Sequence, residues 1–311
     1  MIFSMHEHEH EHDSSRPGVE RGGEQRRLVL TLCLSIVAMV VEALGGYLAN
    51  SLALMSDAAH MMADAGAIGL SLFALRIGAR PADAKRTYGY YRLEILAALL
   101  NGALLIAIAI GIAVEGYHRL MNPEPVAVRT VVFLALFGIA LNAAGMWITH
   151  TRGQSSMNLR STFLHLAGDL LNSVGVLASA GIIALTGQLA VDPIVSFLIA
   201  ATIVWSAIRL CKEAVDVLLE GAPRHIVVSD VAEVLEKVPG VDAVHDLHIW
   251  TITSGLVALS CHIVVTCVGP GCRSHDQILT DAKAVLKDRF AIEHTTIQFE
   301  SDQYRHEEVV H

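Results

Sequence analysis

Six long apolar stretches constrain the fold of this chain more than any other feature of its sequence. They lie near residues 28–49, 52–75, 93–117, 130–150, 162–185 and 190–210. Each is close to the roughly 20 residues that an α-helix needs to cross the hydrocarbon of a bilayer. Hydrophobic residues make up 53% of the chain, more than a soluble core requires. We therefore predict an α-helical membrane protein with six transmembrane helices.

Six spans place both ends of the chain on one side of the membrane, and the positions of Lys and Arg indicate which side. The flanks and loops on the side of the termini carry Arg21, Arg26, Arg27, Arg76, Arg80, Lys85, Arg86, Arg92, Arg152, Arg160, Arg209 and Lys212. The opposite loops carry Arg119 and Arg129. Since basic loops remain in the cytoplasm, we expect both termini there, and the inner (cell) membrane as the location if the chain is prokaryotic.

The pattern changes after Lys212 from a membrane type to a soluble type. It predicts helix 228–238, strand 242–252, strand 256–266, helix 274–290 and strand 294–300. This αββαβ order is that of a small ferredoxin-like α+β domain. We therefore divide the chain into a His-rich N-terminal tail (1–27), a six-helix transmembrane domain (28–212) and a cytoplasmic ferredoxin-like domain with its tail (213–311).

Charge and cysteine content narrow the choice of partners. The formal net charge is −9, and much of the acid lies in the N-terminal tail and the soluble domain, which argues against nucleic acid. Cys267 and Cys272 are spaced wider than a zinc knuckle and lack a second cysteine pair. We interpret them as part of an ordinary reduced loop, with a metal role as the alternative.

Ionisable side chains inside two spans are the strongest functional signal. His60 and Asp64 in the second span, and His165 and Asp169 in the fifth, are each four positions apart, so each pair projects from one patch of its helix. Such groups cost about 2.5–3.5 kcal/mol each in a bilayer and therefore mark an ion pathway or a ligand site. Two imidazoles and two carboxylates form a tetrahedral set that Zn²⁺ accepts. The alternative is a neutral hydrogen bond between helices in each pair.

Further polar residues occur in the spans. Asp57 lies one turn before His60 on nearly the same stripe of its helix. For the others we expect hydrogen bonds between helices or positions near the interface, and Glu42, deep in the first span, is also a candidate to line a water-filled path. These residues are Glu42, Asn101, Glu115, Asn142, Asn172 and Asp192.

Four stretches resemble the zinc-exporting branch of the cation diffusion facilitator family: SLALMSDAAHMMADAGAIGLSL, RTYGYYRLEILAALLNG, FLHLAGDLLNSVGVL and VHDLHIWTITSGLVALSCHI. The resemblance covers about residues 28–300 and implies a homodimeric secondary transporter rather than an enzyme. It implies export of cytoplasmic Zn²⁺ in exchange for protons, through a site formed by the second and fifth spans. The transport ligands of the family fall on His60, Asp64, His165 and Asp169.

The family comparison also bears on selectivity. Some members have Asp where His60 stands, and the His form goes with a preference for zinc over cadmium. Other members bind metal in the loop between the second and third spans. That loop here carries Asp83 and no histidine, so we expect no site there.

In the soluble domain, the resemblance favours His225, His245, His262 and Glu300 as metal ligands, with Zn²⁺ as a possible regulatory ligand. Alternation along a regular strand puts His245 and His248 on opposite faces. The apolar residues Val257, Leu259, Cys261 and Ile263 predict the buried face of the next strand and leave His262 on the other face. The alternative is that these are ordinary surface histidines.

The N-terminal stretch HEHEHEHD interleaves histidines with acids, a composition that would collect Zn²⁺ loosely. Its histidines are His6, His8, His10 and His12. The alternatives are an expression-tag remnant and a solvated tail. For the whole chain, the rival classes are an intramembrane metalloenzyme, whose usual H-E-x-x-H motif is absent, and a metal-sensing membrane protein with the soluble domain as its output.

Overall fold

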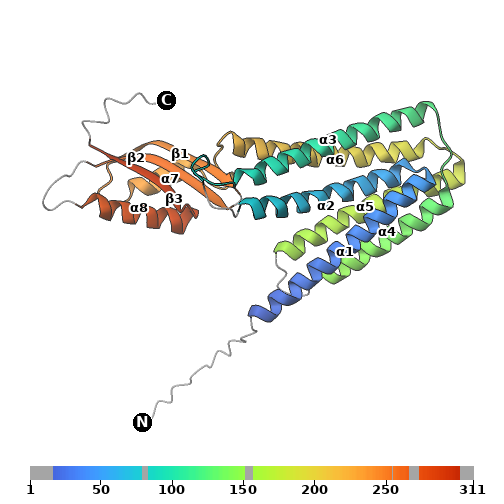
Figure 1. Cartoon of the computed structure of the whole chain (residues 1–311), viewed down its shortest axis with the longest axis horizontal. Helices are drawn as coiled ribbons and strands as arrows, with labels where there is room; N and C mark the ends of the chain where they lie inside the picture. The colour runs from blue at the N-terminus through green and yellow to red at the C-terminus, as the bar shows by residue number, and fades with distance from the viewer. Residues whose placement is uncertain (1–16, 79–82, 151–156, 254, 266–272, 302–311) are drawn as a thin grey trace, which may run out of the picture. The chain divides into compact units, whose positions relative to one another are not determined.

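The computed structural model describes residues 17–78, 83–150, 157–253, 255–265 and 273–301. Long helices occupy the apolar stretches: α1 (Pro17–Ala49), α2 (Leu52–Gly78), α3 (Arg92–Met121), α4 (Val128–Thr149), α5 (Met157–Thr186) and α6 (Val191–Leu218). They are followed by α7 (Val228–Glu236), β1 (Ala243–Thr253), β2 (Leu256–Val264), α8 (His275–Phe290) and β3 (His294–Glu300), as labelled in Figure 1. The predicted αββαβ order of the soluble domain is confirmed.

Five helices in the described part of the chain are long and apolar enough to cross a membrane. They cover Arg26–Ala49, Arg92–Met121, Val128–Thr149, Thr162–Thr186 and Val191–Leu218. The 27-residue α2 is not among the five, and several of its side chains lie outside the described residues. The prediction of a multi-pass α-helical membrane protein is therefore confirmed, and the sixth span stays a prediction.

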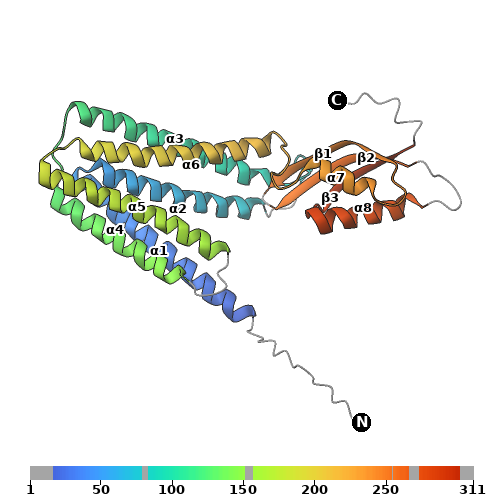
Figure 2. The same ribbon diagram turned by 180° about the vertical axis from the view of Figure 1, so that it is seen from behind.

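Contacts divide the chain into two compact units, residues 1–65 with 108–203 and residues 66–107 with 204–311. In the first unit, α4 packs against both α1 and α5, and the three helices run side by side in Figures 1 and 2. Glycines permit the close approach: a Cβ on Gly45 would stand 2.1 Å from Leu134 Cδ1, and one on Gly138 would stand 2.2 Å from Glu42 Oε1. Small residues of this kind let membrane helices pack closely.

The first turn of α2 is held by a carboxylate from α6. Asp192 Oδ2 accepts hydrogen bonds from the backbone amides of Leu52 (2.6 Å) and Ala53 (3.3 Å), and its Oδ1 accepts one from Ser51 Oγ (2.6 Å). Ser51 Oγ in turn accepts from the amide of Leu54, as an N-cap residue does. The free amides of the helix start are thereby satisfied inside the protein. The expected interhelical role of Asp192 is confirmed.

The turn before α2 is fixed from α3. Asn50 has a φ of 53°, the left-handed conformation that commonly ends a helix. Arg119 donates to the backbone oxygen of Asn50 (2.8 Å) and to its Oδ1 (2.9 Å), and Asn50 Nδ2 donates to Glu124 Oε2 (2.9 Å). These bonds fix where α2 begins, and therefore where His60 and Asp64 stand along it.

The soluble domain has a three-stranded sheet in the order β1-β2-β3, with β1 antiparallel and β3 parallel to β2. Helix α7 packs on β1 and α8, and α8 packs on β3. The apolar face predicted for the second strand is confirmed, because its side chains belong to the buried core. That core comprises Ile226, Val231, Leu235, Val238, Ile249, Val257, Leu259, Cys261, Ile263, Val265, Ile278, Ala282, Leu286 and Ile292.

A β-bulge interrupts β1 near its start. His245 pairs with His262 and His248 pairs with Ser260, so three steps along β1 match two steps along β2. Asp246, with a φ of 47°, lies in this bulge. Because His262 and Ser260 share a face of β2, His245 and His248 also share a face. The prediction that His245 and His248 lie on opposite faces is therefore wrong, since it assumed a regular strand.

Candidate metal sites

The four ionisable side chains predicted on α2 and α5 come together in one cluster. His60 Nε2 lies 3.6 Å from Asp64 Oδ2 and 3.8 Å from Asp169 Oδ1. His165 Nε2 lies 3.6 Å from Asp64 Oδ2 and 3.6 Å from Asp169 Oδ2. The centroids of the two imidazole rings are 6.4 Å apart. Each carboxylate therefore faces both histidines, and each helix supplies one residue of each kind.

These separations differ from those of hydrogen bonds. The N–O distances of 3.6 and 3.8 Å exceed the range of about 2.7–3.2 Å for N–H···O bonds. Ligand atoms bound at about 2.0–2.1 Å around a tetrahedral Zn²⁺ stand about 3.3–3.4 Å from one another. Asp64 Oδ2 and Asp169 Oδ1 are also buried without a hydrogen-bond partner. The four His–Asp pairs are therefore not direct hydrogen bonds. His60, Asp64 and Asp169 offer ligand atoms within 4.8 Å of one another, as a metal-binding group does, and His165 lies beside this group and faces both carboxylates.

Exposure changes steeply across the cluster. The side chains of His165 and Asp64 are 46% and 36% exposed, that of His60 is 18% exposed and that of Asp169 is 2% exposed. Along α2, exposure increases from the start of the helix toward its C-terminal half. An ion can therefore approach from the side of Asp64 and His165, whereas Asp169 closes the inner side of the cluster.

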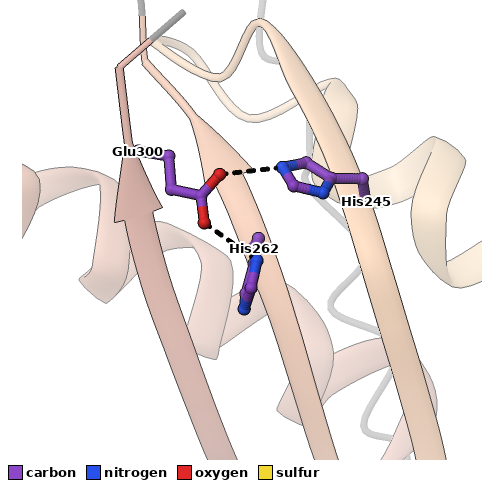
Figure 3. A group of neighbouring side chains, drawn as sticks. All are labelled: His245, His262 and Glu300. Carbon is purple, nitrogen blue, oxygen red and sulfur yellow. Dashed lines mark hydrogen bonds and ion pairs between the residues drawn. The ribbon is translucent and has the colours of Figure 1, made fainter. Parts of the chain in front are cut away.

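A second cluster joins the three strands of the soluble domain (Figure 3). Glu300 on β3 pairs through Oε2 with His245 Nε2 (3.0 Å) and through Oε1 with His262 Nδ1 (2.9 Å). Gln298 Nε2 also donates to Glu300 Oε1 (2.7 Å). The ligand atoms of the two histidines and of Glu300 lie within 4.8 Å of one another. These residues could hold a metal ion, and they also satisfy one another directly by hydrogen bonds.

The bulge adds a second carboxylate to this cluster. Asp246 Oδ1 is 2.9 Å from His248 Nε2, and its Oδ2 is 3.7 Å from His262 Nε2. The hydrogen bond with His248, together with the nearby histidine charges, holds the pKa of Asp246 below its usual range. Asp246 was not among the residues predicted for this cluster. The sequence did hold a signal for a bulge here. Between two histidines of a predicted strand stands an aspartate, a residue type that tolerates the left-handed conformation.

The other residues singled out in the sequence lie apart from these clusters or outside the described residues. His225 is exposed in the turn that precedes α7 and is not among the ligand atoms grouped around Glu300. The stretch with His6, His8, His10 and His12 lies outside the described residues, and so does the segment from Cys267 to Cys272.

A membrane-type helix bundle with a partly buried His–Asp cluster, followed by a small domain with a second carboxylate–histidine cluster, is the arrangement expected of a metal-cation transporter. Two family models match the chain: the cation efflux transmembrane domain over residues 28–219, and the cytoplasmic domain of cation efflux proteins over residues 223–302. The chain belongs to the cation efflux, or cation diffusion facilitator, family.

Several relatives match nearly the whole chain. The metal cation efflux system protein CzcD of Cupriavidus metallidurans is 41% identical over 280 residues, which cover 90% of this chain and 87% of that protein. The cadmium, cobalt and zinc/H(+)-K(+) antiporter of Bacillus subtilis is 35% identical and covers 93% of both chains. The zinc transporter ZitB of Escherichia coli is 37% identical, over 88% of this chain and 87% of its own. These relatives are metal cation transporters and not enzymes, so the rival interpretation as an intramembrane metalloenzyme is excluded.

A solved structure is also similar in sequence. The metal-bound C-terminal domain of the CzcD transporter from Cupriavidus metallidurans is 37% identical, covers 24% of this chain and 99% of its own, and has a TM-score of 0.22.

Proposed function

We propose that this protein is a secondary transporter that exports Zn²⁺ from the cytoplasm in exchange for protons. The transport site consists of His60, Asp64, His165 and Asp169. The observation that carries the proposal is the cluster of these four side chains, in which every His–Asp separation is 3.6 or 3.8 Å. Zinc transport by the relatives named ZitB supports the choice of ion.

The ligand set accounts for the preference for zinc over harder ions. Two imidazole nitrogens make the site poorer for Mg²⁺ and Ca²⁺ than an all-oxygen site, and the absence of a thiolate among the four ligands makes it poor for Cu(I). Cadmium and cobalt appear in the name of the Bacillus subtilis antiporter. Zn²⁺ is the ion whose tetrahedral N₂O₂ coordination these four residues fit best.

Protons drive the cycle by competing for the same ligand atoms. An imidazole must be neutral and a carboxylate ionised to bind a metal, so metal binding releases protons and protonation releases the metal. In the conformation described, Asp64 and His165 are exposed and Asp169 is buried. We assign this as the form that takes Zn²⁺ from the cytoplasm, because exposure lies on the side of the C-terminal half of α2, which leads to the basic loop. Rocking of the helices then opens the site to the opposite, more acidic side.

The wider assembly follows from the same proposal. The protein lies in the inner membrane and crosses it six times, with both termini and the soluble domain in the cytoplasm. The soluble domain is ferredoxin-like and pairs two chains into a homodimer. Its ligands His245, His262 and Glu300, with His225, bind Zn²⁺ as a regulatory ion.

Transport in reconstituted vesicles tests the proposal. An imposed pH gradient should drive Zn²⁺ uphill, and Zn²⁺ movement should shift the internal pH in the opposite sense. Asp169→Ala should abolish both signals. A Zn²⁺ flux that ignores the pH gradient, with no pH change in return, would identify a passive channel and refute the exchange mechanism.

A further inference from the structure

Two buried carboxylates near the transport site have no role in the scheme above. Glu42 on α1 is 0% exposed and Asp57 on α2 is 1% exposed. Both carboxylate oxygens of Glu42 and Oδ1 of Asp57 are buried without a hydrogen-bond partner. Ionisable groups inside a membrane protein are costly and are usually retained for a function.

The two carboxylates gather around one serine of α5. A Cβ on Gly138 would stand 2.2 Å from Glu42 Oε1 and 3.4 Å from Ser173 Oγ, so these two atoms meet over the same glycine. Ser173 Oγ lies 3.4 Å from Asp57 Oδ2 and 3.0 Å from the backbone oxygen of Asp169. Ser173 therefore joins Asp57 to the helical turn that carries Asp169, and Glu42 lies beside this pair at Gly138.

Glu42 and Asp57 lie toward the closed side of the cluster. Glu42 is near the end of α1 and Asp57 near the start of α2, so both stand roughly 8–10 Å from the α1–α2 turn at about 1.5 Å per residue. Asp64 stands roughly 18 Å from that turn by the same measure. The pair therefore lies between the transport ligands and the end of the bundle that is closed in this conformation.

The surroundings of Glu42 suit a proton better than a metal ion. The ionisable groups that act on it are Asp57 and Asp169, on α2 and α5, and α4 presents Gly138. Among the described residues, Glu42 and Asp57 belong to no group of three potential metal ligands within 4.8 Å. A buried carboxylate without a hydrogen-bond donor or a cation is stable only as the neutral acid.

We propose that Glu42 and Asp57 form a proton-carrying site that passes protons between the transport ligands and the end of the bundle at the α1–α2 turn. This inference rests on the proposed zinc/proton exchange. A neutral carboxylic acid of the pair gives its proton to water as H₃O⁺, and the carboxylate left behind takes up the proton released at the transport ligands. The reverse path runs through the same two steps in the opposite order. Ser173 lies between the carboxylates and can relay the proton through its hydroxyl group.

Two transport assays on the full chain in vesicles separate this role from metal binding. Net uptake driven by a pH gradient needs protons to cross, whereas exchange of radioactive zinc for unlabelled zinc at equal pH does not. Glu42→Gln and Asp57→Asn should lower net uptake at least about tenfold, the scale on which a positioned proton carrier acts. The same variants should keep zinc exchange within about threefold, or about 0.7 kcal/mol.

Further variants make the result decisive. Gly138→Ala should reproduce the effect of Glu42→Gln, because the new methyl group occupies the space of Glu42 Oε1. If Glu42→Gln fails to fold, the Gly138→Ala and Asp57→Asn variants test the proposal in its place. Glu115→Gln is the matched control, since Glu115 is a half-exposed membrane carboxylate that pairs with Arg119, and it should leave both assays unchanged. Equal loss of net uptake and exchange in the Glu42 and Asp57 variants, or no loss of either, would overturn the proposal. Normal zinc exchange by Asp169→Ala would instead refute the transport site itself.

Discussion

Replacing Asp169 with alanine should weaken Zn²⁺ binding far more than replacing Asp64. A four-ligand zinc site is worth about 10–16 kcal/mol in small zinc-finger peptides, so one ligand is worth about 2.5–4 kcal/mol, or about 10²–10³ in Kd. Asp169 is 2% exposed, so no water can easily take its place, whereas Asp64 is 36% exposed. Since water is an accepted fourth ligand of Zn²⁺, we expect Asp64→Ala to weaken binding only about tenfold.

Zinc titration of the full chain in detergent measures this difference, with a competing chelator to set the free Zn²⁺ concentration. Both variants are made in a background with His245→Ala and His262→Ala, so that the soluble domain does not contribute. Asp169→Asn, which keeps the shape of the side chain, is the matched control for packing. Because Asp169 Oδ1 has no hydrogen-bond partner to lose, unfolding temperatures should change little. Binding by Asp169→Ala within about threefold of the parent, or equal losses in the two alanine variants, would refute the reasoning.

Four other changes have defined outcomes. His60→Asp should raise Cd²⁺ uptake relative to Zn²⁺ in competition, because an oxygen-richer site discriminates less against the larger ion; an unchanged ratio would argue against His60 as a ligand. Removal of residues 1–20 should leave turnover at saturating zinc intact and at most raise the half-saturating concentration, so an inactive truncation would give the tail a direct role. Asp192→Ala should lower the free energy of unfolding by about 2–4 kcal/mol, since it leaves buried donors of the first turn of α2 without an acceptor. Thermal unfolding in detergent measures this change, and an unchanged stability would contradict the role of Asp192 in holding α2. Burial raises the pKa of the Cys261 thiol to about 12, and alkylation requires the thiolate, so at pH 8 iodoacetamide should modify Cys261 much more slowly in the native than in the unfolded protein. Equal rates, read by mass spectrometry, would contradict its burial.

The His–Asp cluster of α2 and α5 could be predicted because helix geometry is local. A spacing of four puts two side chains on one patch of any α-helix, and the two His–Asp pairs in α2 and α5 need only pack together to form a site. Helix geometry also placed Asp57 one turn from His60, but the sequence could not predict that Glu42 of α1 lies close to it. Glu42 and Asp57 are grouped around Ser173 by the packing of α1, α2, α4 and α5, a property of the assembled bundle.

In the soluble domain, the bulge in β1 could not be predicted from the alternation pattern of the sequence. Element order and the apolar face of β2 follow from alternation, which holds as long as a strand is regular. One extra residue at Asp246 breaks the alternation in β1 and changes the face on which His248 lies relative to His245. The alternation pattern of a single strand cannot predict a bulge, because the pairing with the neighbouring strand decides where the extra residue is accommodated.

The left-handed backbone at Asp246 has a consequence for how the soluble-domain cluster of this protein can change by mutation. Aspartate, asparagine and glycine tolerate that conformation, whereas a β-branched residue does not. A valine at this position would favour a regular strand and turn His245 away from His262 and Glu300, although these three residues were unchanged. On the proposed zinc binding, a single substitution in the bulge would therefore disrupt the soluble-domain site without replacing His245, His262 or Glu300.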